Sequence, residues 1–148
     1  MSAAGESIWI YHAPCGGGCG GCDWEVEALL APRYDAEALG LGFVDTPRHA
    51  DVLIVTGGVT KQSAPRLQEL VIQTPKPKVC LVVGACGCSQ GIFSGGYHMS
   101  GPAEPVIKAV DEAARIIYVP GCPPRPEALI KALRGAKELL DEPAAEAM

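Results

Sequence analysis

The chain has 148 residues, a length typical of one domain with its own core, and its 48% hydrophobic content excludes an intrinsically disordered protein. A net charge of -5 and an isoelectric point of about 5.1 argue against nucleic acid as a partner, because nucleic-acid-binding proteins carry a basic face. No apolar run approaches the roughly 20 residues of a membrane span, and Met1–Ser7 lacks the features of a signal peptide, so we expect a cytoplasmic protein.

The first third of the chain is expected to alternate strands with a glycine-rich loop and a helix. A strand is predicted over Ser7–His12, and the loop Ala13–Cys22 follows it with five Gly and one Pro. Apolar residues at helical spacing predict a helix over Asp23–Leu30, which we expect Asp23 to cap. A second strand is predicted over Leu41–Asp45.

The remaining two thirds continue the same alternation. Ala50–Thr56 and Lys78–Gly84 are unbroken apolar runs, which are typical of parallel strands buried on both faces. The amphipathic segment Ala64–Gln73 between them predicts a helix. A last strand is expected over Ile116–Val119, followed by a terminal helix over Pro124–Leu140.

This order of elements predicts an α/β fold, flavodoxin-like in outline, with a mostly parallel sheet. The sequence contains no internal repeat and no sign of a second domain, so we expect a single domain over residues 1–148. Residues from about 141 to 148 are expected to form a flexible tail.

Seven cysteines are the most informative feature of the composition. They are Cys15, Cys19, Cys22, Cys80, Cys86, Cys88 and Cys122. Their odd number and the absence of a secretion signal argue against disulfides, which rarely persist in a reducing cytosol. Ligation of a metal or a metal cluster is then the leading use for these thiols.

The cysteines follow the predicted strands in a regular way. Cys19 and Cys22 come after the first strand, Cys86 and Cys88 after the strand that ends at Gly84, and Cys122 after the last strand. Ligands of open parallel sheets bind beyond the carboxyl ends of the strands. Three strand ends would therefore deliver thiols to one edge of one sheet.

Two kinds of site are compatible with this spacing. Cys19 and Cys22 form a CxxC pair, and with Cys86 and Cys122 they offer four candidate thiolates, the number that a [4Fe–4S] cluster needs. A structural zinc site would use the same ligand type but usually has a second CxxC, which this chain lacks. The cluster is favoured, and a four-cysteine zinc site of structural or regulatory function remains open. Cys80 lies inside an apolar strand and is expected to be a core residue.

Four motifs stand out along the chain: CGGCDWE at 19–25, PRHADVLIVTGGVT at 47–60, GACGCSQGIF at 84–93 and VPGCPPRPEALI at 119–130. These motifs, and the order in which they follow one another, resemble the small subunits of energy-converting, membrane-bound group 4 [NiFe] hydrogenases. The resemblance extends from about Ile8 to Leu133. The same superfamily includes the 20 kDa cluster-bearing subunit of complex I.

The resemblance implies one [4Fe–4S] cluster, whose ligands map onto Cys19, Cys22, Cys86 and Cys122. It implies a non-catalytic oxidoreductase subunit that relays electrons to a nickel–iron site in a partner large subunit, for proton reduction or hydrogen oxidation. Further implied partners are a ferredoxin-like iron–sulfur subunit and integral membrane subunits, which would hold the chain at the inner face of the membrane. Glu25 would lie at the contact with the large subunit, with an interface or proton-path role.

A second electron-transfer reading is the cluster-bearing subunit of a complex I-like quinone oxidoreductase. That relative has adjacent cysteines at the first site, whereas this chain has CxxC, which favours the hydrogenase reading. The chain departs from the family pattern at Trp24, at Gly58, and in the extra thiols of Cys15 and Cys88. We expect the low-charge cysteine loops to face another subunit, with Trp24 as an anchor of that interface.

Overall fold

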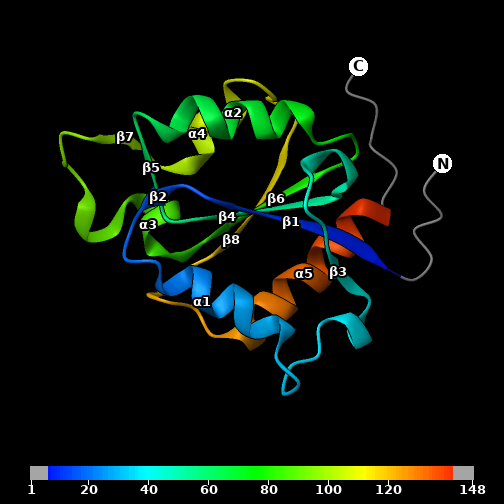
Figure 1. Ribbon diagram of the computed structural model, residues 1–148. Helices are drawn as coiled ribbons and strands as arrows, with labels where there is room; N and C mark the ends of the chain where they lie inside the picture. Colours follow the sequence, from blue (N-terminus) through cyan, green and yellow to red (C-terminus); the bar gives the residue numbers. More distant parts are fainter. Residues whose placement is uncertain (1–6, 142–148) are drawn as a thin grey trace.

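A parallel sheet runs through the centre of the computed structural model, which describes residues 7–141 (Figure 1). Its five strands are β1 (Ile8–Pro14), β3 (Leu41–Phe43), β4 (Val52–Thr56), β6 (Val79–Val83) and β8 (Arg115–Val119). They lie in the order β3-β1-β4-β6-β8, and every neighbouring pair is parallel. Counted along the chain, this is the order 2-1-3-4-5 of flavodoxin-like sheets. The predicted fold class is confirmed.

The two central strands are buried from end to end because both faces of the sheet are covered. Every residue of β4 and β6 is buried. Their side chains alternate between two cores, so that Ile54 and Leu81 pack in one while Leu53 and Cys80 pack in the other. The unbroken apolar runs of the sequence are the direct cause of this arrangement.

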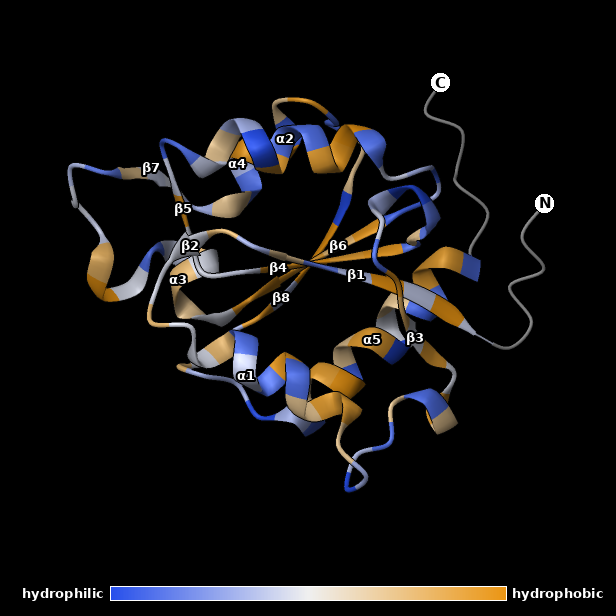
Figure 2. Cartoon of the chain, viewed as in Figure 1, coloured by the Kyte–Doolittle hydropathy of each residue, from blue (hydrophilic) through white to orange (hydrophobic). Residues whose placement is uncertain are grey.

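Helices cover each face of the sheet. In Figure 1, α2 (Ser63–Gln73) and α4 (Ala103–Lys108) lie above it, whereas α1 (Gly21–Glu27) and α5 (Pro126–Asp141) lie below. Figure 2 shows the orange apolar strands enclosed between these layers. Short 3-10 turns complete the connections: η1 (Ala28–Leu30), η2 (Glu37–Leu39), η3 (Pro47–His49) and η4 (Gly91–Phe93).

A second, smaller sheet lies beyond the carboxyl ends of the central strands. It is antiparallel, in the order β2-β5-β7, and consists of β2 (Gly16–Gly17), β5 (Gly58–Thr60) and β7 (Met99–Gly101). The short helix α3 (Gly84–Ser89) lies beside it at the left of Figure 1. The small sheet was not predicted because strands of two or three residues with several Gly show no apolar alternation.

Three points of the predicted secondary structure need correction. Asp23 does not cap the first helix: α1 begins at Gly21, and its N-cap is Gly20 in the left-handed conformation, with no side-chain cap bond. The predicted strand over 41–45 ends at Phe43, and the helix α4 was missed. The tail predicted over about 141–148 lies, from residue 142 onward, outside the described residues. Between residues 7 and 141, no helix is both long and apolar enough to cross a membrane.

Candidate metal centre

The first pair of candidate ligands lies in the connection from β1 to α1. Cys19 is exposed and Cys22 is half-buried in the first turn of α1. The preceding backbone is held against the end of β4, because β2 pairs with β5 through Gly17 and Gly58. A Cβ at Gly17 would lie 2.1 Å from the carbonyl oxygen of Gly58, so only glycine permits this close approach.

The other two candidate ligands follow β6 and β8. Cys86 is buried in α3, which begins directly after β6, and Cys122 is exposed in the connection from β8 to α5. The N–H of Ala85 donates a hydrogen bond to the carbonyl of Gly121 at 2.7 Å, which ties the two connections together. Three separate strand ends thus place their cysteines at one edge, as expected from the parallel sheet.

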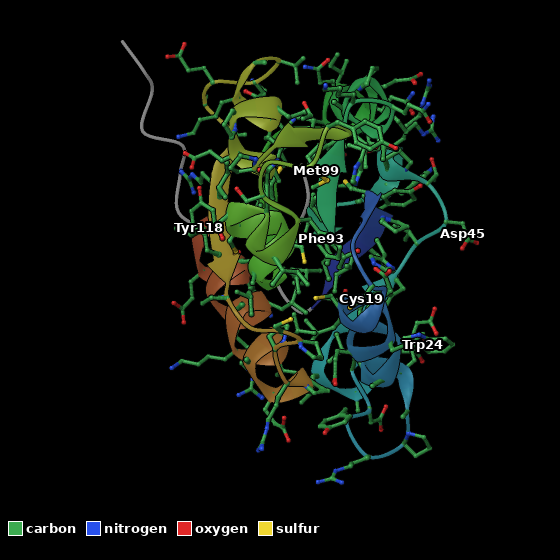
Figure 3. All side chains as sticks on the ribbon, turned by 90° about the vertical axis from the view of Figure 1, so that its left-hand side faces the viewer. Cys19, Trp24, Asp45, Phe93, Met99 and Tyr118 are labelled. Carbon is green, nitrogen blue, oxygen red and sulfur yellow. The ribbon has the colours of Figure 1, made fainter. Side chains whose placement is uncertain are left out.

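All four thiols line one cavity of about 100 Å³, together with Asp23 and several glycines. The cavity lies beyond the carboxyl ends of β1, β4, β6 and β8, and it includes the switch point between β1 and β4 at which flavodoxin-like sheets bind ligands. Figure 3 looks onto this edge, where Cys19 lies between Trp24 and the segment that carries Phe93.

Glycines line this cavity, and their lack of a side chain lets the segments that carry the thiols approach one another closely. A Cβ at Gly84 would lie 2.4 Å from the Cys22 sulfur, and one at Gly18 would lie 3.7 Å from the Cys86 sulfur. Each of these contacts joins the β1–α1 connection to the end of β6. Four soft thiol donors around a small cavity walled by backbone are the donor set that iron–sulfur clusters use.

The thiols of the cavity influence one another electrostatically. Burial raises the pKa of Cys22 to about 11, and the charges of Cys86, Asp23, Cys19 and Cys122 contribute to this rise in that order. Burial also raises the pKa of Cys86, with contributions from Cys122 and Cys19. Mutual repulsion of thiolates is relieved when they share a cationic metal group. Within residues 7–141, however, no three Cys, His, Asp or Glu side chains are grouped closely enough for one metal ion.

The three remaining cysteines lie outside the cavity lining. Cys80 is fully buried in β6, and burial raises its pKa to about 12. Cys15 is buried, with its thiol 3.9 Å from the carbonyl oxygen of Ala13. Cys88 directs its thiol toward the carbonyl of Val82 at 3.7 Å. The core position predicted for Cys80 is observed.

Two residues singled out from the sequence lie on α1 beside the cavity without lining it. The Trp24 side chain is 73% exposed, which leaves it available to a partner, while Glu25 is half-buried. Sequence reasoning missed a polar cluster behind the cavity, in which Asp23 contacts His12 and Thr56. The only sequence signal for it was that His12 and Thr56 are the last residues of two predicted strands.

A flavodoxin-like sheet with a thiol-lined cavity at its switch point defines a class of α/β protein that can hold a metal cluster at the carboxyl edge. The chain belongs to the family described as NADH ubiquinone oxidoreductase, 20 Kd subunit, whose model matches residues 19–136. This family implies an iron–sulfur cluster. The superfamily resemblance found in the four motifs is confirmed.

Three relatives show how the family divides. The chain is 44% identical to the probable membrane-bound hydrogenase subunit mbhJ of Pyrococcus furiosus, over 92% of this chain and 77% of the relative. It is 40% identical to formate hydrogenlyase subunit 7 of Escherichia coli, over 93% of this chain and 51% of that relative. It is 38% identical to a subunit of the NADH-quinone oxidoreductase of Citrifermentans bemidjiense, over 86% and 69% of the two chains. All three are subunits of oxidoreductase complexes.

Solved structures share the same fold. A chain of the membrane-bound sulfane sulfur reductase, an archaeal respiratory membrane complex, superposes with a TM-score of 0.72 at 29% identity, over 95% of this chain and 73% of that one. A chain of the Ni-Fe-Se hydrogenase from Desulfomicrobium baculatum gives a TM-score of 0.65 at 16% identity, over 90% and 62%. The second likeness establishes the fold alone.

Proposed function

We propose that this chain is the electron-transfer subunit of an energy-converting hydrogenase and that it holds one [4Fe–4S] cluster on Cys19, Cys22, Cys86 and Cys122. The observation that carries the proposal is the meeting of these four thiols, from three strand ends, around one cavity at the switch point of the sheet. The 44% identity to a membrane-bound hydrogenase subunit supports the choice of complex. The whole chain would then act as a single iron–sulfur domain.

The residues of the chain would bind, position and shield the cluster. A bound [4Fe–4S] cluster supplies reversible one-electron transfer. The four thiolates would hold it, and the glycine-rich backbone beside Gly18 and Gly84 would bring the protein close to it. Cys86 lies on the buried side of the cavity, whereas Cys19 and Cys122 lie at its exposed rim. The wall at Cys86 is covered by the rest of the chain, whereas the rim at Cys19 and Cys122 is open to the outside. Electrons would therefore enter or leave the cluster through the rim.

The open rim is the face where we propose that the large subunit with the nickel–iron site docks. Trp24, exposed beside the rim, would anchor that contact, and Glu25 would line it with an interface or proton-path role. No residue of this chain is proposed as catalytic. A ferredoxin-like subunit would supply or accept the electrons, and integral membrane subunits would hold the complex peripherally at the inner face of the cell membrane.

The direct test is metal analysis of the complex purified anaerobically through a tag on this chain. We expect iron and acid-labile sulfide near four per copy of the chain from this cluster, after subtraction of the clusters of other subunits, and nickel in the large subunit. A reduced sample should show the paramagnetic signal of a [4Fe–4S] centre. Stoichiometric zinc in place of iron on this chain would instead establish the structural zinc site.

A second candidate is a cluster-bearing subunit of a complex I-like quinone oxidoreductase. It is supported by the 38% identity to an NADH-quinone oxidoreductase subunit. The two candidates share the cluster and differ in the large subunit. A purified complex with full iron, no nickel and no hydrogen-dependent dye reduction would favour the second candidate.

A further inference from the structure

Thr56, the last residue of β4, contacts both ends of the loop that carries Cys19 and Cys22. At the start of the loop, the N–H of Cys15 donates to the carbonyl oxygen of Thr56 at 2.9 Å. At its end, the Thr56 hydroxyl donates a short hydrogen bond to the Asp23 carboxylate. One residue of the rigid central sheet thus closes the loop at both ends.

His12 completes this arrangement from the neighbouring strand. Its Nε2 lies 2.9 Å from the Thr56 hydroxyl oxygen and 3.1 Å from Asp23 Oδ1. The single hydroxyl proton of Thr56 is used in the bond to Asp23, so Nε2 must carry its own hydrogen for both of its contacts to be attractive. Counting hydrogens therefore assigns the Nε2–H tautomer to His12, with the carboxylate accepting from both neighbours.

The polar cluster of His12, Asp23 and Thr56 is buried at Thr56 and partly buried at His12 and Asp23. Thr56 is 1% exposed, and the side chains of His12 and Asp23 are 20% and 34% exposed. Burial lowers the pKa of His12 and outweighs the opposing effects of Asp23 and Glu27, which favours a neutral imidazole. Hydrogen bonds in such surroundings are stronger and more directional than bonds in bulk water.

Asp23 connects the polar cluster of His12, Asp23 and Thr56 to the thiols, because it follows Cys22 directly and also lines the cavity. We propose that His12 and Thr56 are positioning residues that hold Asp23 and, through Asp23, fix the CxxC loop. In this way they set the reduction potential of the iron–sulfur cluster. The proposal rests on the proposed function. Outer hydrogen bonds of this kind commonly orient the ligands of metal centres and tune their potentials.

The sign of the effect follows from charge. A carboxylate beside the cavity opposes the addition of an electron to a bound cluster, and two donated hydrogen bonds withdraw part of that negative charge. Removing either donor should leave more of the charge on Asp23 and make the cluster harder to reduce. The midpoint potential should therefore shift downward, and the reduced spectrum should change, because the loop also loses a constraint.

The experiment compares matched variants in the anaerobically purified complex. Thr56→Val keeps the β-branched shape and removes the hydroxyl, whereas Thr56→Ser keeps the hydroxyl. His12→Phe removes the donor, whereas His12→Gln restores an N–H at a similar reach. Thr74→Val serves as a control, because Thr74 is equally buried but its hydroxyl bonds to Leu70, away from the cavity. The readouts are iron content, the midpoint potential from a spectroscopically monitored redox titration, and the spectrum of the reduced cluster.

We expect Thr56→Val and His12→Phe to lower the potential and alter the spectrum, with Thr56→Ser, His12→Gln and Thr74→Val close to the wild type. Loss of iron in Thr56→Val with retention in Thr56→Ser would also support the proposal, because the hydroxyl would then hold the loop. Unchanged potentials in Thr56→Val and His12→Phe at full iron content would overturn it. Equal shifts within each pair would overturn it as well. A wild-type chain without iron would instead refute the proposed function itself.

Discussion

Cys80 and Cys86 are six residues apart, yet they belong to regions of the molecule built on different physics. Cys80 lies within β6, where every residue is buried and apolar packing on both faces supplies the stability. Cys86 lies at the carboxyl edge, where the neighbouring cysteine loops are rich in glycine and two of the four cavity thiols are exposed. Apolar packing stabilises the sheet, whereas the edge lacks an apolar core. The edge is held by backbone contacts and by the metal group that it is proposed to bind.

The two ends of the sheet also differ in how they hold polar groups. At the amino end, Lys78 and Asp111 form an ion pair with an N–O distance of 3.1 Å, and their side chains are only 4% and 8% exposed. Lys78 also donates to the carbonyls of Val71 and Thr74, which joins the end of α2 to the sheet. At the carboxyl end, the polar cluster of Asp23 faces a cavity. The first arrangement is structural and the second adjoins the site.

The largest effect should come from the thiols of the edge. We expect Cys19→Ala, Cys22→Ala, Cys86→Ala and Cys122→Ala each to destroy or degrade the proposed cluster, because each removes one of its four ligands. Cys80→Ala should keep the cluster and cost about 1 kcal/mol in packing. Iron and sulfide analysis of the purified variants, together with their thermal unfolding, measures both outcomes.

Cys88→Ala tests the choice of ligand within the Cys86-Gly87-Cys88 segment. Cys88 lies outside the cavity lining, so its removal should leave the iron content unchanged. Loss of the cluster in Cys88→Ala together with its retention in Cys86→Ala would show that the wrong member of the pair had been chosen.

The next largest effect should come from the amino end of the sheet. Asp111→Asn leaves the buried Lys78 ammonium without its counter-charge, and breaking a buried pair in this way costs about 3–5 kcal/mol. Thermal or denaturant unfolding should register this loss. Lys76→Met is the matched control, because the Lys76 side chain is exposed and its bond to Asp111 should contribute about 0–1 kcal/mol.

The pH dependence of that variant has a definite sign. Burial raises the pKa of Asp111, but the hydrogen bonds and charges of Lys76 and Lys78 outweigh it, so the pKa lies below its usual 3.8. A lowered pKa in the folded state gives a stabilisation that is present above pH 3.8 and is lost as the pH falls through the folded value. Wild type and Asp111→Asn should therefore converge in stability only below pH 3.8. A constant difference across that range would contradict the assignment.

The same contrast explains what could be predicted from the sequence. The buried strands β4 and β6 and the helix α2 follow from apolar periodicity, which is a local property, and they were placed to within two residues. The meeting of Cys19, Cys86 and Cys122 followed from the topology of parallel sheets. The small sheet and the contact of Asp23 with His12 and Thr56 could not be predicted, because they join short segments that are distant in the sequence and carry no periodic pattern.

A third effect, on association rather than folding, should separate the two exposed tryptophans. Trp24 lies beside the cavity, whereas Trp9 lies near the amino end of β1 with its ring packed against Gly42. Trp24→Ala should weaken the affinity for the proposed large subunit, with a loss of about 2 kcal/mol, roughly 30-fold, and little change in unfolding. Trp9→Ala should instead lower the stability against unfolding and leave the affinity for the large subunit nearly unchanged. Titration of the separated large subunit onto each variant, alongside thermal unfolding, measures both; equal affinities of the two variants would place the interface elsewhere.

The smallest effect compares two glycines with nearly the same φ. Gly84 and Gly95 have φ of +86° and +82°, so replacing either with alanine should cost about 1 kcal/mol of stability. Their surroundings differ: a Cβ at Gly95 meets nothing within 4 Å, whereas one at Gly84 would lie 2.4 Å from the Cys22 sulfur. Gly84→Ala should therefore displace that thiol and lower the iron content, while Gly95→Ala should keep it full. Because both glycines have positive φ, the difference in iron between the two variants reports mainly on the thiol contact, and equal iron contents would show that the cavity wall at Gly84 does not control the cluster.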